Sequence, residues 1–159
     1  MMFEIETSRL QFRRFTNSDF DLHYRYIASD AQVMQTLLPE KALDVTAARV
    51  WFDRFVAHWE NYQFGVWLLF DKQTENFIGQ CGLRFLADTP QLELTYAIAR
   101  CYWGQGLATE AAQASLRYGF EKFDADQCVT KQSNQTRAAV TSSAFSGNNV
   151  CITCASLAM

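Results

Sequence analysis

Apolar and polar residues alternate near the start of the chain, which is the pattern of a half-buried β-strand. Residues 4–15 follow this alternation and place Leu10 and Phe12 on one face, so we expect a first strand there. Residues 16–19 (TNSD) then supply several side chains that cap helices well. Apolar residues recur at helical spacing behind these caps, and this predicts a helix over residues 20–28.

Two more helices are expected before the middle of the chain. The first is short and covers residues 31–37, with Pro39 ending it. The second runs from Asp44 to about Tyr62 and carries a regular apolar stripe. The residues of this stripe are Ala48, Phe52, Phe55, Val56 and Trp59.

The pattern then changes from helical spacing to short apolar runs. Residues 64–70 (FGVWLLF) are too short and too apolar for an amphipathic helix, so they predict a buried strand. Residues 71–76 (DKQTEN) form a turn, and residues 77–86 form the returning strand of a hairpin. A second turn at residues 87–90 leads into residues 91–99 (QLELTYAIA), which we expect to complete an antiparallel meander.

Helical spacing returns at about residue 106 and continues to residue 123, and residues 127–131 (QCVTK) then resemble a strand. A strand, a turn, a helix and a strand in this order form a βαβ crossover. We therefore predict an α/β (α+β) fold whose mixed sheet is antiparallel in the meander and parallel across the crossover. The inner face of the crossover helix is expected to contain Ala108, Ala112, Leu116, Phe120 and Phe123.

Residues 135–159 differ in composition from the rest of the chain. From residue 132 onward Arg137 is the only charged residue and Phe145 the only aromatic one. No apolar stripe at helical or strand spacing can be traced there. We expect one domain over residues 1–159, and two interpretations of this tail stay open: a loop-rich terminal segment, or a sequence altered after Asn134.

Composition excludes several classes of function. With 17 acidic and 14 basic residues the net charge is −3, which argues against a nucleic-acid binder and suits a basic small molecule or a basic peptide end better. No apolar run is long enough to cross a bilayer and the first residues do not resemble a signal peptide, so we expect a cytoplasmic protein without membrane partners.

The five cysteines do not predict a metal site or a disulfide framework. Their number is odd and they are scattered through apolar segments, as reduced buried thiols are. Cys151 and Cys154 have CxxC spacing, but a closed zinc site needs about four ligands and the chain has no second CxxC. We therefore expect no bound metal.

The segment YWGQGLATEAA (residues 102–112) is the strongest candidate for chemistry. It places two glycines between a strand and a helix, where the first backbone N–H groups of the helix lack intrahelical partners. Glycines let an anion approach such a turn without meeting a Cβ atom. Neither the dinucleotide fingerprint GxGxxG nor the P-loop GK[ST] is present, so a dinucleotide-dependent oxidoreductase is disfavoured.

The segment LELTYAIARCYWGQGLATEAAQASLRYGFEKF resembles the acetyl-CoA-binding core of the GNAT superfamily of N-acetyltransferases, and is most similar to its Rim-type branch. The likeness covers about residues 4–134, including the opening ETSRLQFRRFTNSDF. It implies a sheet with helices on both faces and acetyl-CoA as co-substrate. The cofactor-binding residues it implies are Tyr96, Ala97, Ile98, Trp103, Gly104, Gln105, Gly106, Leu107, Ala108, Thr109 and Asn134.

Acetyl transfer to an amine needs a group that accepts the proton of the amine. Glu93 is the candidate base, because it is a lone carboxylate in an otherwise apolar strand. A solvent-exposed position at the strand end is the alternative. His23 could meet the acceptor or could be a core-edge residue, and His58 is expected at the surface.

Arg100 and the lysine at position 131 could reach CoA phosphates or could simply be solvated. The resemblance fails after Asn134, where Arg137 replaces an expected serine and no tyrosine occurs after Tyr118 to serve as the usual acid. The predicted function is therefore acetyl transfer to a primary amine, such as a peptide N-terminus or a small amine. The alternative is an acyl-CoA-binding protein with little or no turnover. A strand edge left open by the altered tail would favour a homodimer.

Overall fold

We analysed a computed structural model, which describes residues 4–37, 41–85, 92–123, 127–131 and 137–141. One seven-stranded sheet runs through it, and the strands lie side by side in chain order. The strands are β1 (Ile5–Glu6), β2 (Leu10–Arg14), β3 (Val66–Asp71), β4 (Phe77–Phe85), β5 (Leu92–Ile98), β6 (Gln127–Lys131) and β7 (Arg137–Thr141). Strands β5 and β6 are parallel and the other neighbouring pairs are antiparallel, as the predicted meander and crossover require.

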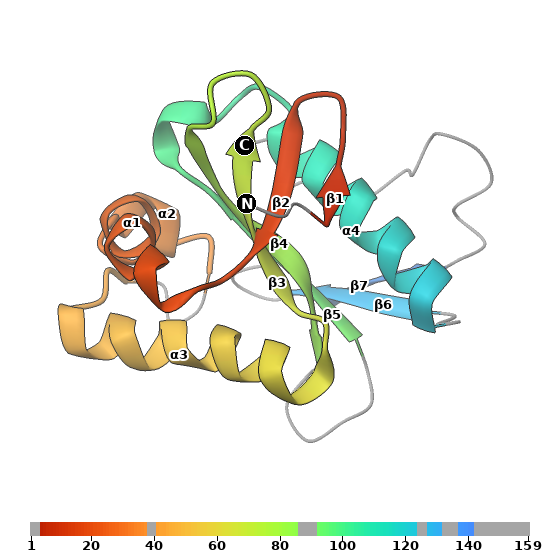
Figure 1. The fold of residues 1–159 in the computed structure, drawn as a ribbon, viewed down its shortest axis with the longest axis horizontal. Helices are drawn as coiled ribbons and strands as arrows, with labels where there is room; N and C mark the ends of the chain where they lie inside the picture. The colour runs from red at the N-terminus through yellow and green to blue at the C-terminus, as the bar shows by residue number, and fades with distance from the viewer. Residues whose placement is uncertain (1–3, 38–40, 86–91, 124–126, 132–136, 142–159) are drawn as a thin grey trace.

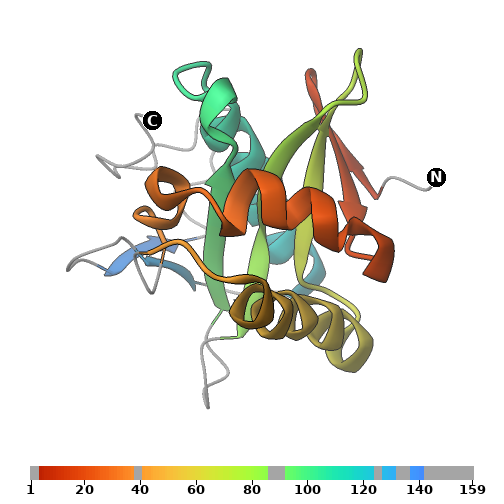
Figure 2. The ribbon, with the colours of Figure 1, turned by 90° about the vertical axis from the view of Figure 1, so that its left-hand side faces the viewer.

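The helices cover both faces of this sheet. Helices α1 (Phe20–His23), α2 (Ala31–Met34) and α3 (Val45–Tyr62) lie on one face, and α4 (Leu107–Phe123) lies on the other (Figure 1). In the view turned by 90°, α1 to α3 lie in front of the sheet and α4 lies behind it (Figure 2). A π-helical turn, Tyr24–Ala28, continues α1, so residues 20–28 are helical as predicted.

Two hydrophobic cores result, one on each face. Strand β3 shows the division: Leu68 belongs to the α3-side core, whereas Trp67 and Leu69 belong to the α4-side core. The α3-side core also contains Phe15, Ile27, Val33, Met34, Phe52 and Phe55. The α4-side core also contains Leu10, Phe12, Ile78, Leu94, Ala108, Ala112 and Leu116.

Local sequence explains where the helices begin and end. The carboxylate of Asp44 accepts a hydrogen bond from the backbone N–H of Ala47 and caps α3, and that of Asp30 caps α2 in the same way. Gln63 adopts a left-handed conformation with φ of 60° and ends α3. The predicted bounds of α3 are thus confirmed, while Pro39 lies outside the described residues.

One prediction about strands was wrong, and one strand had not been predicted. Residues 4–15 form a hairpin rather than one strand, because Thr7 exchanges hydrogen bonds with Leu10 and turns the chain so that Ile5 pairs with Phe12. The tail also contains β7, which pairs with β6 although its sequence RAAVT has no clear alternation.

Candidate active site

The glycine turn (residues 103–106) connects the end of β5 to α4. A short 3₁₀ turn, Arg100–Tyr102, follows β5, and Gly104 and Gly106 then adopt φ values of 76° and 74°. Helix α4 starts at Leu107, and its first helical hydrogen bond runs from the N–H of Glu110 to the carbonyl of Gly106. The N–H groups of residues 107–109 precede that bond, so they are the helix donors that lack intrahelical partners.

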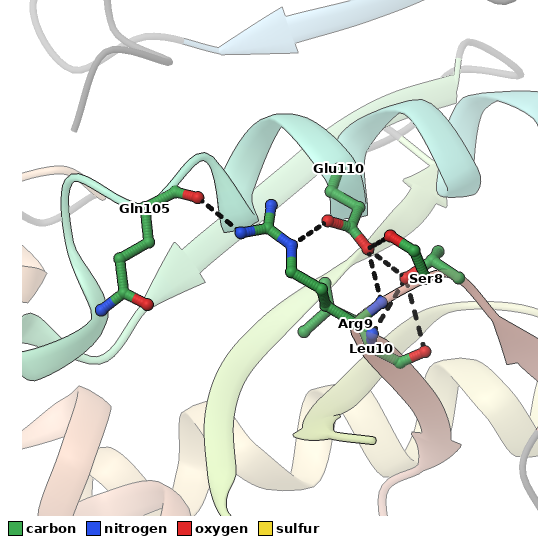
Figure 3. Close-up of polar contacts among 6 residues, drawn as sticks. Ser8, Arg9, Leu10, Gln105 and Glu110 are labelled. Atoms are coloured by element: carbon green, nitrogen blue, oxygen red, sulfur yellow. Dashed lines mark hydrogen bonds and ion pairs between the residues drawn. The ribbon is translucent and has the colours of Figure 1, made fainter. Parts of the chain in front are cut away.

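The turn is fastened on both sides. The indole Nε1 of Trp103 donates a hydrogen bond of 2.7 Å to the carbonyl of Ile98 in β5. On the other side, Nη1 of Arg9 donates one of 2.8 Å to the carbonyl of Gln105 (Figure 3). Apart from its two chain neighbours, no described residue has a heavy atom within 4 Å of where a Cβ would stand on Gly104, so this part of the structure leaves the turn open to a ligand there.

Glu110 in the first turn of α4 binds the β1–β2 turn (Figure 3). Its carboxylate accepts hydrogen bonds from Nε of Arg9 (2.6 Å), the N–H of Arg9 (3.0 Å), Oγ1 of Thr7 (2.5 Å) and Oγ of Ser8 (3.1 Å). Burial alone would raise the pKa of Glu110, but the hydrogen bonds from Thr7 and Arg9 lower it below the usual value. The sequence did not identify this contact, since about a hundred residues separate its partners.

Strands β5 and β6 separate next to the glycine turn. They pair at Leu92, Glu93 and Leu94, whereas β5 continues to Ile98 and stays paired with β4 along its whole length. Among the described strands, none pairs with this side of residues 95–98. The side chains of Tyr96 and Ile98 face the α4-side core and Ala97 faces the α3-side core. Residues 96–98 therefore offer backbone groups, not side chains, to anything that enters the gap.

Glu93 lies one residue before Leu94, after which the two strands separate. It pairs with Arg84 of β4 on one side and with Val129 of β6 on the other. Its side chain is 3% exposed and accepts a hydrogen bond of 2.9 Å from Nε of Arg84. The alternative of a solvent-exposed strand end is therefore wrong, and the carboxylate is buried and ion-paired.

Comparison with known proteins identifies this arrangement. The chain matches the acetyltransferase (GNAT) domain family over residues 9–144. The chain belongs to the GNAT acetyltransferase family. Enzymes of this family are N-acetyltransferases that use acetyl-CoA, and the match extends beyond Asn134, where the resemblance was expected to end.

Individual relatives agree with this family. The uncharacterized protein YkkB of Bacillus subtilis is 31% identical over 121 residues, which cover 75% of this chain and 69% of YkkB. The crystal structure of an acetyltransferase from Agrobacterium tumefaciens has a TM-score of 0.71 at 25% identity, covering 85% and 78% of the two chains. RimL, a ribosomal L7/L12 α-N-protein acetyltransferase in complex with coenzyme A, has a TM-score of 0.63 at 17% identity and covers 78% and 71%. At that identity RimL shows a shared fold only.

In this GNAT chain His23 is a core residue. It is fully buried and contacts the rings of Phe15, Trp51, Phe52 and Phe55. Its Nε2 lies 2.6 Å from Oε1 of Gln80, and burial lowers its pKa to about 4 despite that hydrogen bond. Among the described residues, Nδ1 of His23 and Nε2 of Gln80 have no partner.

His58 lines a cavity between α3 and β4. The cavity has a volume of about 150 Å³ and is lined by Trp51, Arg54, Phe55, His58, Val66, Arg84 and Phe85. Both ring nitrogens of His58 are engaged, Nδ1 with the carbonyl of Phe64 at 2.8 Å and Nε2 with the N–H of Phe85 at 3.3 Å. The expected surface position of His58 is thus wrong, because it is half-buried and bonded on both sides.

Of the remaining candidates, Arg100 lies just before the glycine turn and others lie outside the described residues. Nη1 of Arg100 donates a hydrogen bond to Oε1 of Gln32, and its guanidinium forms an ion pair with Asp30. This ion pair is exposed to solvent. Asn134, Cys151 and Cys154 lie outside the described residues. Within the described part, no group of three His, Cys, Asp or Glu residues could hold a metal ion, and no helix could span a membrane.

Proposed function

We propose that this GNAT protein transfers the acetyl group of acetyl-CoA directly to a primary amine of a peptide N-terminus or a small molecule. The observation that carries this proposal is the separation of β6 from β5 beside the glycine turn. An open strand edge leads there to a helix start with a left-handed glycine on each side of Gln105. An extended chain fits the edge, and a diphosphate fits the helix start.

The backbone groups of the glycine turn and of the open edge suit the chemical groups of acetyl-CoA. The N–H groups of Leu107, Ala108 and Thr109, with the two glycines, would hold the diphosphate, and Trp103 and Gln105 would shape the turn. The backbone of Tyr96, Ala97 and Ile98 would hold the pantetheine arm, and an N–H of that edge would polarise the thioester carbonyl. When bound, acetyl-CoA supplies an activated acyl group. Asn134 stays a predicted contact.

Glu93 is the proposed proton acceptor. It lies one residue before Leu94, the last residue of β5 that pairs with β6, so it is close to where the open edge begins. Arg84 orients the carboxylate through the hydrogen bond that its Nε donates to Oε2. A base held in this way can accept the amine proton as the new amide bond forms and the thiolate leaves.

The ion pair of Glu93 also favours a second function. A carboxylate that is 3% exposed and paired with an arginine is a common structural feature. In that case the protein would bind acyl-CoA with little or no turnover. Release of free thiol that depends on an added amine supports the enzyme, and binding without such release supports the second function.

Calorimetric titration with acetyl-CoA, with NAD as the control, tests cofactor binding first. We expect micromolar binding of acetyl-CoA and no heat from NAD, because the turn lacks the dinucleotide fingerprint. Absence of acetyl-CoA binding would refute the proposal. Self-association through a sheet edge stays a separate prediction, which sedimentation velocity checks.

A further inference from the structure

The cavity between α3 and β4 is lined by both apolar and charged side chains. Trp51, Phe55, Val66 and Phe85 supply the apolar surface, and Arg54 and Arg84 supply guanidinium groups. A cavity of about 150 Å³ holds a body roughly the size of benzene. The walls therefore suit a small branched or cyclic hydrocarbon group.

The charge of the cavity is positive. Arg54 and Arg84 both line it, while no described carboxylate does. The buried carboxylate of Glu93 forms an ion pair with Arg84 and neutralises its charge. His58 adds no charge, since Nε2 accepts from the N–H of Phe85 and only Nδ1 carries a proton. Among the described lining residues one guanidinium charge is left over, and this charge attracts an anion and repels a polycation.

The position of the cavity connects it to the proposed reaction. Arg84 is the register partner of Glu93, and Glu93 is in turn the partner of Val129, where β5 and β6 still pair. Arg84, which lines the cavity, is thus one strand away from Glu93, and the open edge of β5 begins after the next residue, Leu94. A ligand in the cavity would lie close to that point.

We propose that this cavity is the acceptor subsite and that it takes an amine which also carries a carboxylate and a small apolar side chain, as a free amino acid does. This inference rests on the proposed acetyl transfer. Arg54 would bind the carboxylate, the aromatic walls would bind the side chain, and the amine would point toward Glu93. The net negative charge of the chain favours basic acceptors, but the positive charge of the cavity would repel them from this site.

A matched set of acceptors tests the subsite. Leucine, leucinamide and 3-methylbutylamine share one side chain and differ in the carboxylate, and spermidine represents polycations. With acetyl-CoA present, we expect thiol release with leucine to exceed that with 3-methylbutylamine at least about tenfold, as one charge-assisted contact requires. Faster release with 3-methylbutylamine or spermidine would overturn the inference.

Variants separate the subsite from the reaction. Arg54→Gln should abolish the preference for leucine, whereas Arg117→Gln, an exposed arginine of α4 on the other face, should leave it intact. Arg84 is less suitable because it also holds Glu93. An unchanged preference in Arg54→Gln would contradict the assignment of this residue.

Direct binding makes the subsite testable without turnover. Leucine should change the tryptophan fluorescence of the chain in the millimolar range, and the change should disappear in Trp51→Phe and weaken in Arg54→Gln. Such binding with no thiol release from any amine would support the subsite and refute the enzyme. No binding of leucine would overturn the subsite even if another amine were acetylated.

Discussion

At the scale of single residues, His23 shows how burial controls chemistry. Its ring is surrounded by aromatic side chains of α3 and by Phe15, and its one hydrogen bond goes to Gln80. Burial favours the neutral ring and lowers the pKa of His23 to about 4 from 6.5. The residue therefore stays uncharged in the folded protein at neutral pH.

The pKa of His23 predicts a loss of stability in acid. The unfolded chain binds a proton below pH 6.5, while the folded chain binds it only near pH 4. The free energy of unfolding should therefore fall as the pH drops through this window, by roughly 3 kcal/mol at most. Urea unfolding at a series of pH values measures it. The His23→Gln variant should have a lower free energy of unfolding at neutral pH, and that free energy should fall less between pH 6.5 and pH 4. An equal fall in the two proteins would show that His23 does not cause the pH dependence.

Glu93 carries the second prediction at this scale. Replacing it by glutamine keeps the size of the side chain and removes the charge. We expect Glu93→Gln to lower turnover about a hundredfold or more, as loss of a general base does, with nearly unchanged affinity for acetyl-CoA. Initial rates and calorimetry measure the two quantities. Equal turnover in the two proteins would leave Glu93 a structural partner of Arg84.

At the scale of elements, the β1–β2 hairpin and α4 support each other through one carboxylate. Glu110 accepts hydrogen bonds from Thr7, Ser8 and Arg9, and the same Arg9 binds the carbonyl of Gln105. The hairpin thereby fixes both the first turn of α4 and the turn before it. The turn between β1 and β2, although far away in sequence, thus positions the glycine turn.

Loss of this carboxylate should affect both stability and binding. Glu110→Ala leaves the donors of the hairpin without an acceptor and should reduce the free energy of unfolding by about 2 kcal/mol. It should also weaken acetyl-CoA binding, since Arg9 would no longer be held beside Gln105. Glu121→Ala, an exposed glutamate of the same helix, is the matched control. Equal affinities in the two variants would show that the hairpin does not position the turn.

The sequence predicted long periodic elements better than contacts between distant residues. The stripe of α3 and the crossover of β5, α4 and β6 follow local patterns, and both are confirmed. The hairpin in residues 4–15 was missed because a single polar turn interrupts an otherwise regular alternation. Within the site, the glycine turn was readable as a motif. The pairing of Glu93 with Arg84 was not, since it depends on strand register.

At the scale of the whole molecule, the sheet divides the protein into two cores. Ile27 belongs to the α3-side core and Ile78 to the α4-side core, and both are fully buried. The candidate acceptor cavity opens among residues of α3 and β4, whereas the helix of the glycine turn packs on the other face. Binding of the acceptor thus depends on packing on the α3 side of the sheet, and binding of acetyl-CoA depends on packing on the α4 side.

This division predicts independent responses to mutation. Ile27→Val and Ile78→Val should each reduce the free energy of unfolding by about 1 kcal/mol through loss of one methylene group. Their effects should add to within about 0.5 kcal/mol in the double variant, because the sheet separates them. Chemical denaturation of the four proteins closes the cycle. A larger coupling energy would show that the two cores respond as one.

The open edge of β5 has a consequence for how such a protein evolves. Backbone groups of residues 96–98 form it, and every residue except proline contributes the same N–H and C=O. Point mutations there change side chains that face the cores and leave the edge itself in place. The cavity beside α3 is made of side chains, so each substitution alters its shape or charge. Descendants of this chain can therefore exchange acceptors far more easily than they can exchange the acyl donor.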